Sequence, residues 1–256
     1  MTPDVLLAFL VGAVVGSFLN VCIYRLPRNR SVVWPASACP HCRRQLSWFE
    51  NVPILGYVAL RGRCRTCGAA IGVQYPIVEL VTALLFAGAW WYYGPGLLLV
   101  SRVLFGCALI VLFAIDLEHH LLPNAITLPG IAAGFGFSFF TDPGWSSSLL
   151  GILAGGGSLY LIAEAYYRLR HEEGLGMGDV KMLAMIGAFL GWRLTVMTLM
   201  MASLAGSIIG LGIIAWKGEG MKYALPFGTF LAIGAGLAAS VGPSVLDWYM
   251  QQFLYR

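Results

Sequence analysis

Long apolar segments, most of them about 20 residues in length, recur along this sequence and constrain its fold more than any other feature. A helix of that length crosses a bilayer, because each residue adds about 1.5 Å and the hydrocarbon core is about 30 Å thick. The eight candidate crossings lie near residues 4–24, 75–93, 97–116, 124–140, 146–167, 179–191, 194–216 and 224–241. The sequence therefore predicts an all-α polytopic membrane protein with about eight transmembrane helices.

The amino-acid composition excludes the main alternatives. Hydrophobic residues make up 59% of the 256 residues, and charged residues make up only 11%. A soluble domain carries about 25% charged residues, and an intrinsically disordered chain is far less apolar than this one. The first apolar segment contains Asp4 and is not preceded by a basic stretch, so we expect a retained transmembrane helix and not a signal peptide.

A polar insert, residues 25–74, separates the first two apolar segments. It contains eight arginines and a single acidic residue, Glu50. Basic residues beside a membrane span stay on the cytoplasmic side. We therefore expect the insert in the cytoplasm and the N-terminus on the opposite side of the membrane. Alternation of the crossings then places the loops at 117–123, 168–178 and 217–223 in the cytoplasm as well.

Four of the six cysteines form two CxxC pairs within this insert, Cys39 with Cys42 and Cys64 with Cys67. Each pair can present two thiolates from a tight turn, and two such turns supply the closed, four-sulfur shell that structural zinc prefers. An arginine-rich insert buries too little apolar area to fold alone, so a zinc ion would stabilise it. Two disulfides or four free thiols are the alternatives, and a cytoplasmic location disfavours disulfides. The other two cysteines are expected to pack within apolar segments.

Two aspartates stand at the ends of apolar segments. Asp116 ends the third segment, and Asp179 starts the sixth. Carboxylates in membrane spans are costly and are therefore candidates for function. The expected topology puts both at the cytoplasmic border, where a helix bundle could bring them together. Two neighbouring carboxylates can share one proton, so that one activates water and the other polarises a carbonyl, as in aspartic proteases. Gly176 and Gly178 would allow a substrate backbone to approach closely.

Other interpretations of these polar residues stay open. A carboxylate at a helix end can also be an N-cap or an interfacial residue. Glu79 could bond to neighbouring core groups or contact a substrate. His119 and His120 are adjacent and should point in different directions, so we expect interfacial residues and not a metal site. A proton-coupled transporter is a rival function, because membrane carboxylates also relay protons. A zinc-bearing assembly module without catalytic activity would need neither aspartate.

Taken in order, these motifs resemble those of the type IV prepilin leader peptidases, which also process type II secretion pseudopilins. The matching stretches are residues 16–27, 39–42, 61–68, 75–79, 114–124, 176–181 and 226–230. The Gly-x-Gly-Asp element at 176–179 is also similar to that of presenilin-type intramembrane proteases. The ordered set covers nearly the whole chain, which makes the resemblance more specific than any one motif.

The resemblance implies an enzyme of the bacterial inner membrane. Members of the family cut a short basic leader from prepilins at the cytoplasmic face, and they commonly methylate the new N-terminus with S-adenosylmethionine. The residues implied for these roles are Asp116 and Asp179 for catalysis and Cys39, Cys42, Cys64 and Cys67 for structural zinc. No fingerprint for the methyl donor is visible, so its binding residues stay unassigned. A peptidase without methylation is the alternative within the family.

The expected organisation is a first transmembrane helix (1–24), a cytoplasmic zinc-binding insert (25–74) and a transmembrane aspartic peptidase core (75–256). The N-terminus would be periplasmic. The expected partners are prepilin or pseudopilin substrates and the lipid bilayer, with no nucleic acid, and the sequence does not fix the oligomeric state.

Two positions depart from the family pattern. Thr229 stands where a proline is expected after Pro226-Phe-Gly, and Asn124 stands where an aspartate is frequent. We expect neither residue to touch the catalytic pair, and we expect both to affect how a substrate is positioned.

Overall fold

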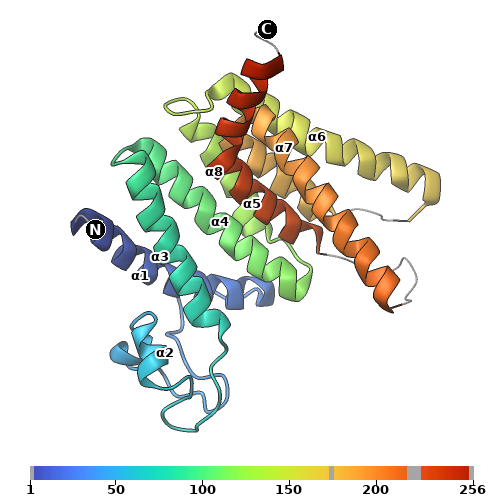
Figure 1. The fold of residues 1–256 in the computed structure, drawn as a ribbon. Coiled ribbons are helices and arrows are strands. Elements are labelled where there is room, and N and C mark those ends of the chain that lie inside the picture. The colour runs from blue at the N-terminus through green and yellow to red at the C-terminus, as the bar shows by residue number, and fades with distance from the viewer. Residues whose placement is uncertain (1–2, 173–175, 218–225, 254–256) are drawn as a thin grey trace. The chain divides into compact units, whose positions relative to one another are not determined.

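The computed structural model consists of helices and loops, with no β-strand, over the residues that it describes, 3–172, 176–217 and 226–253 (Figure 1). The helices are α1 (Pro3–Arg25), η1 (Leu26–Arg28), η2 (Trp48–Asn51), α2 (Leu55–Ala59), α3 (Gln74–Tyr93), α4 (Leu97–His119), α5 (Asn124–Phe137), α6 (Trp145–Arg170), α7 (Met177–Lys217) and α8 (Phe227–Phe253). The chain divides into two compact units, Met1–Val111 and Leu112–Arg256, and each is described by itself.

Six described helices, α1, α3, α4, α6, α7 and α8, are long and apolar enough to cross a membrane. The prediction of an all-α polytopic membrane protein is confirmed, and the count of eight crossings was approximate. Helix α5 has only 14 residues and would be about 21 Å long, which is shorter than the hydrocarbon core. The predicted loop at 217–223 and the start of the last predicted crossing fall largely on residues 218–225, outside the described residues.

Helix α7 contains a break that explains the remaining difference in the count. Its 41 residues would measure about 60 Å if straight, roughly twice the hydrocarbon thickness. Gly191 interrupts it with φ 74° and ψ 171°, a left-handed backbone conformation that favours glycine. The two crossings predicted at 179–191 and 194–216 correspond to the two parts of α7 on either side of this break.

In the first unit, α1 packs closely along α3. Two glycines of α1, one turn apart, lie against the α3 backbone. A Cβ atom on Gly12 would lie 2.8 Å from the Cα atom of Ala83, and one on Gly16 would lie 2.7 Å from the Cα atom of Glu79. Small residues at such a spacing allow membrane helices to approach closely, because lipid supplies no hydrophobic force between them.

In the second unit, α7 packs against α5, α6 and α8 (Figure 1). Its first part follows α6, where the Ser148 hydroxyl donates a hydrogen bond of 2.8 Å to the Ala188 carbonyl. Gly151 of α6 and Gly187 of α7 meet backbone to backbone, with no room for a Cβ atom on either. This close packing fixes the position of the first turn of α7, which carries Asp179.

The contact between α6 and α7 yields a stability prediction. Gly151→Ala should destabilise the protein by about 1–3 kcal/mol, because the added methyl group would overlap the α7 backbone. Gly157→Ala is the matched control, since a Cβ atom there meets no other atom within 4 Å. Thermal unfolding of the two variants in the same detergent measures the difference. Equal midpoints would contradict the packing described here.

Candidate functional site

The four cysteines of the insert converge in the first unit. All four sulfur atoms lie within 4.8 Å of one another. The Cys39 and Cys67 sulfurs are 3.8 Å apart, and the Cys42 and Cys64 sulfurs are 4.0 Å apart. A tetrahedral zinc ion with bonds of about 2.3 Å would hold its sulfurs about 3.8 Å from one another. All four cysteines are free of disulfides, so the cluster has the dimensions of a four-thiolate metal site.

The two halves of this cluster fold alike. In each half the N–H of the first cysteine donates to the carbonyl five residues later, with distances of 2.9 Å for Cys39 and 2.8 Å for Cys64. The residue after the second cysteine has a positive φ in both halves, 57° at Arg43 and 70° at Gly68. Hydrogen bonds from the backbone at Cys67 and Thr66 lower the pKa of the Cys64 thiol to about 6. The second turn therefore favours a thiolate at Cys64, whereas burial and the hydrogen bonds to the other three cysteines raise the pKa of the Cys67 thiol to about 11.

An ion pair stabilises the insert beside the cluster. Glu50, the only acidic residue between positions 25 and 74, is buried, and its Oε1 accepts a hydrogen bond of 2.6 Å from Nη2 of Arg44. Its Oε2 accepts the Ser47 N–H at 2.8 Å. The Arg44 guanidinium, followed by the backbone bond from Ser47, holds the pKa of Glu50 below its ordinary value. The carboxylate is therefore ionised at neutral pH and orders the chain after the first pair of cysteines.

Glu79 of α3 ties the insert to the membrane helix. Its Oε2 accepts a hydrogen bond of 2.7 Å from the N–H of Ile54. Ile54 has φ 61°, and the Leu55 N–H donates to the Pro53 carbonyl at 2.5 Å, which together define a tight γ-turn. A β-branched residue adopts such a backbone only when its surroundings hold it there. The expectation that Glu79 bonds to a neighbouring group is confirmed.

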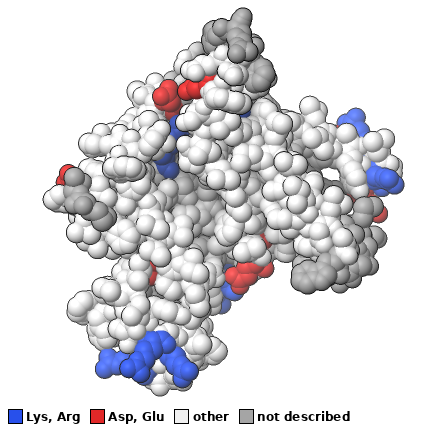
Figure 2. Space-filling model, viewed as in Figure 1, with Lys and Arg blue, Asp and Glu red and all other residues white. Residues whose placement is uncertain are grey.

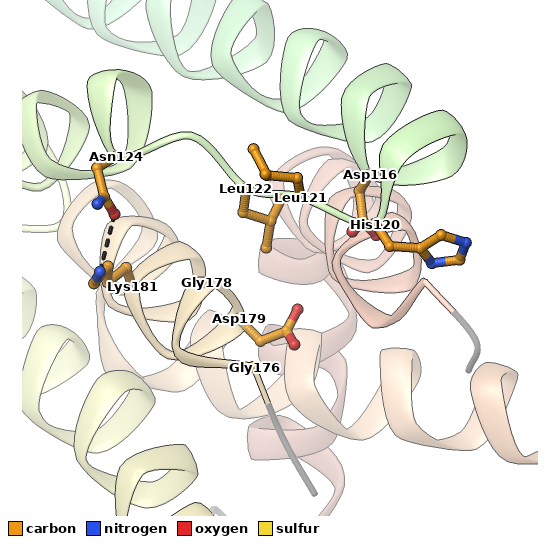
Figure 3. Close-up of a pocket in the computed structure, with 9 residues that line it drawn as sticks. All are labelled: Asp116, His120, Leu121, Leu122, Asn124, Gly176, Gly178, Asp179 and Lys181. Carbon is orange, nitrogen blue, oxygen red and sulfur yellow. Dashed lines mark hydrogen bonds between the residues drawn. The ribbon is translucent and has the colours of Figure 1, made fainter. Parts of the chain in front are cut away.

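A cavity of about 300 Å³ lies in the second unit and brings the two aspartates together (Figure 3). Its lining residues are Asp116, His120, Leu121, Leu122, Asn124, Gly176, Gly178, Asp179 and Lys181. Asp116 reaches it from the end of α4 and Asp179 from the first turn of α7. The two carboxylates that the sequence singled out, far apart along the chain, thus line one cavity.

Asp116 is held by the first turn of α8. It is only 4% exposed, and its Oδ2 accepts two hydrogen bonds from Thr229, at 2.7 Å from the N–H and at 3.0 Å from the hydroxyl. Thr229 is the third residue of α8, and its N–H also donates to the Pro226 carbonyl at 3.2 Å. Gly228 permits this approach, because a Cβ atom there would lie 3.0 Å from the same Oδ2. The expectation that Thr229 does not touch the catalytic pair is therefore wrong.

Asp179 has a different environment. Its side chain is half-buried and accepts no hydrogen bond from any residue that the structure describes. Two glycines precede it and also line the cavity. A Cβ atom on Gly176 would lie at an ordinary contact distance of 3.4 Å from the Asp179 Oδ2, whereas one on Gly178 would lie 3.0 Å from the Cβ atom of Leu122. Gly178 thus makes room for the Leu122 side chain.

The cationic groups of the cavity come from two places. The Lys181 ammonium, two residues after Asp179, donates a hydrogen bond of 2.9 Å to the Asn124 side-chain oxygen (Figure 3). His120 follows the last turn of α4 and is exposed at the cavity. Asn124 therefore shares the cavity with the aspartates, and its side-chain oxygen is bonded to Lys181. The sequence drew attention to neither this bond nor the position of Leu122.

With this geometry in place, comparison with known proteins identifies the family. Residues 10–93 match the bacterial peptidase A24 N-terminal domain, and residues 103–211 match the type IV leader peptidase family. Three similar proteins are all named prepilin leader peptidase/N-methyltransferase. That of Aeromonas hydrophila is 36% identical over 97% of this chain and 94% of its own length. That of Burkholderia pseudomallei is 37% identical over 92% and 84%, and that of Pseudomonas aeruginosa is 34% identical over 96% and 93%.

This chain belongs to the type IV leader peptidase family. No solved structure matches it. The resemblance drawn from the motifs is confirmed. The sequence did not predict the contact of Thr229 with Asp116, but it offered one signal for it. Thr229 is the departure from the family pattern that lies directly after Pro226-Phe-Gly, at the start of an apolar segment.

The bond between Glu79 and Ile54 gives a prediction for the insert. Glu79→Ala should increase trypsin cleavage within residues 25–74, because the Ile54 N–H loses its acceptor and the insert loses its bond to α3. Loss of such a bond costs about 1–3 kcal/mol. Glu79→Gln keeps a side-chain carbonyl acceptor and should be cleaved like the parent protein. Identical cleavage of all three proteins would show that the bond does not hold the insert.

Proposed function

We propose that this protein is a membrane aspartic endopeptidase that removes the leader peptide from type IV prepilins or pseudopilins. The observation that carries the proposal is the position of Asp116 and Asp179 on one cavity, in a chain of the type IV leader peptidase family. The relatives named above supply the substrate class, since each is named a prepilin leader peptidase.

Hydrolysis requires both aspartates in different protonation states. An ionised carboxylate takes a proton from a water molecule, and the water oxygen bonds to the carbon of the scissile carbonyl. The protonated carboxyl group gives its proton to the carbonyl oxygen, which produces a neutral tetrahedral intermediate. When this intermediate collapses, the C–N bond breaks and the leaving nitrogen takes the proton held by the first aspartate. A hydroxyl proton of the intermediate returns to the second, and the enzyme regains its starting state.

We propose that the active site faces the cytoplasm of a bacterium and that the protein lies in the inner membrane. The support is the charge of the insert, which contains eight arginines and a single acidic residue. That residue, Glu50, forms an ion pair with Arg44. Figure 2 shows basic side chains gathered on this part of the molecule. In this arrangement the N-terminus is periplasmic, residues 1–24 form the first crossing, residues 25–74 lie in the cytoplasm, and residues 75–256 carry the peptidase core.

The aspartate assignment predicts a sharp loss of activity. Asp116→Asn and Asp179→Asn should each reduce prepilin cleavage by about 10²-fold to 10⁴-fold, because each removes one partner in proton transfer. Asp247→Asn is the control, since this exposed aspartate of α8 is not among the residues that line the cavity. Cleavage of purified prepilin in detergent, followed by the mobility shift on a gel, measures the effect. Normal cleavage by either of the first two variants would refute the assignment.

We infer that the same chain methylates the new N-terminus with S-adenosylmethionine, because its relatives carry the second name N-methyltransferase. No described residue is assigned to the methyl donor. Mass spectrometry of pilin processed with and without S-adenosylmethionine separates the two activities. Cleaved pilin with the added mass of one methyl group is expected only when the methyl donor is present. Unmethylated product under both conditions would show that the protein is a peptidase without methyltransferase activity.

We propose that Cys39, Cys42, Cys64 and Cys67 bind a structural zinc ion, as their mutual distances and the matching geometry of their two turns support. Four protein ligands leave no open position for water or substrate, so the metal would hold the insert together without entering the reaction.

Metal analysis of the purified protein tests the site. One zinc ion per chain is expected in the parent protein, and Cys64→Ser should lose it because one of the four sulfurs is gone. Cys22→Ser is the control, since Cys22 lies in α1 outside the cluster. A parent protein without zinc, or a Cys64→Ser variant that keeps it fully, would overturn the proposal.

A further inference from the structure

The two aspartates of the cavity have unequal hydrogen bonding. One oxygen of Asp116 receives both donors of Thr229, and its other oxygen has no partner among the described residues. The Asp179 carboxyl group receives no donor from those residues. The difference lies between the two carboxyl groups and does not depend on a bound substrate.

The surroundings of Asp116 favour a negative charge. A carboxylate oxygen accepts both bonds from Thr229 without competition, whereas a proton on that oxygen would oppose the fixed N–H. The helix dipole does not separate the two groups, because Asp116 lies at the start of α8 and Asp179 lies in the first turn of α7. His120, which lines the same cavity, favours a charge on Asp116 when its imidazole is protonated.

The surroundings of Asp179 favour the neutral form. A charge on a half-buried carboxyl group without a donor is costly, and the charge on Asp116 across the cavity adds repulsion. The cation nearest along the chain, Lys181, donates to Asn124. A single proton shared by the pair therefore resides on Asp179.

Resting on the proposed peptidase function, we propose that Asp116 is the base that deprotonates water and that Asp179 is the acid that protonates the scissile carbonyl. Thr229 is the positioning residue that sets this division of roles. A proline at position 229 would offer neither an N–H nor a hydroxyl group, so both hydrogen bonds to Asp116 depend on the threonine found here.

Substitution at position 229 tests the hydroxyl donor. Thr229→Val keeps the N–H and removes the hydroxyl. We expect kcat to fall about tenfold for Thr229→Val, the loss of one hydrogen bond to a charged group, with KM nearly unchanged. The acidic limb of the pH profile of kcat should move about one pH unit upward in Thr229→Val. Thr229→Ser should behave like the parent protein.

Infrared spectroscopy tests the location of the proton without relying on activity. The parent protein at neutral pH should show the carbonyl band of a protonated carboxyl group. That band should vanish in Asp179→Asn and persist in Asp116→Asn. The reverse result would overturn the proposed roles even if every Thr229 variant folds poorly.

The outcomes also separate this inference from the proposed function. If both aspartate variants lose cleavage but Thr229→Val keeps the parental pH profile, Thr229 does not set the roles and the inference fails while the peptidase assignment stands. If either aspartate variant cleaves normally, the peptidase assignment itself fails.

Discussion

A carboxylate inside an apolar helix bundle must receive from the protein the hydrogen bonds that water would otherwise supply, and this requirement organises both units. In the first unit Glu79 accepts the Ile54 N–H and thereby joins α3 to the insert. In the second, Asp116 accepts two bonds from Thr229 and thereby joins the end of α4 to the start of α8. Each carboxylate connects segments far apart in sequence.

Close contacts between helix backbones fix the positions of the two aspartates. Gly151 and Gly187 bring α6 and α7 together, and Gly228 brings α8 within reach of Asp116. The break at Gly191 reconciles a helix of 41 residues with a much thinner bilayer. Asp179 stands on the part of α7 that precedes the break, which is packed against α6. Its position is thus set by helix packing and not by a flexible loop.

Much of this arrangement could be predicted from the sequence, because it depends on local patterns. Apolar length located the helices, even at residues 179–191 and 194–216, and the CxxC spacing identified the cysteines that converge. The position of Thr229 could not be predicted, since a contact between the end of α4 and the first turn of α8 depends on tertiary packing. The contact of Gly178 with Leu122 could not be predicted for the same reason, and the space that the glycines of the Gly-x-Gly-Asp element would leave for a substrate stays a prediction.

The two cysteine turns share one pattern of hydrogen bonds but differ in backbone energy. Gly68 adopts its positive φ freely, whereas Arg43 occupies the same left-handed region at a cost of about 1–2 kcal/mol. Contacts around the first turn, including those of Arg44 with Glu50, must offset that cost. The shape of the second turn is thus compatible with its own backbone, whereas the shape of the first depends on side chains that lie outside the CxxC pair.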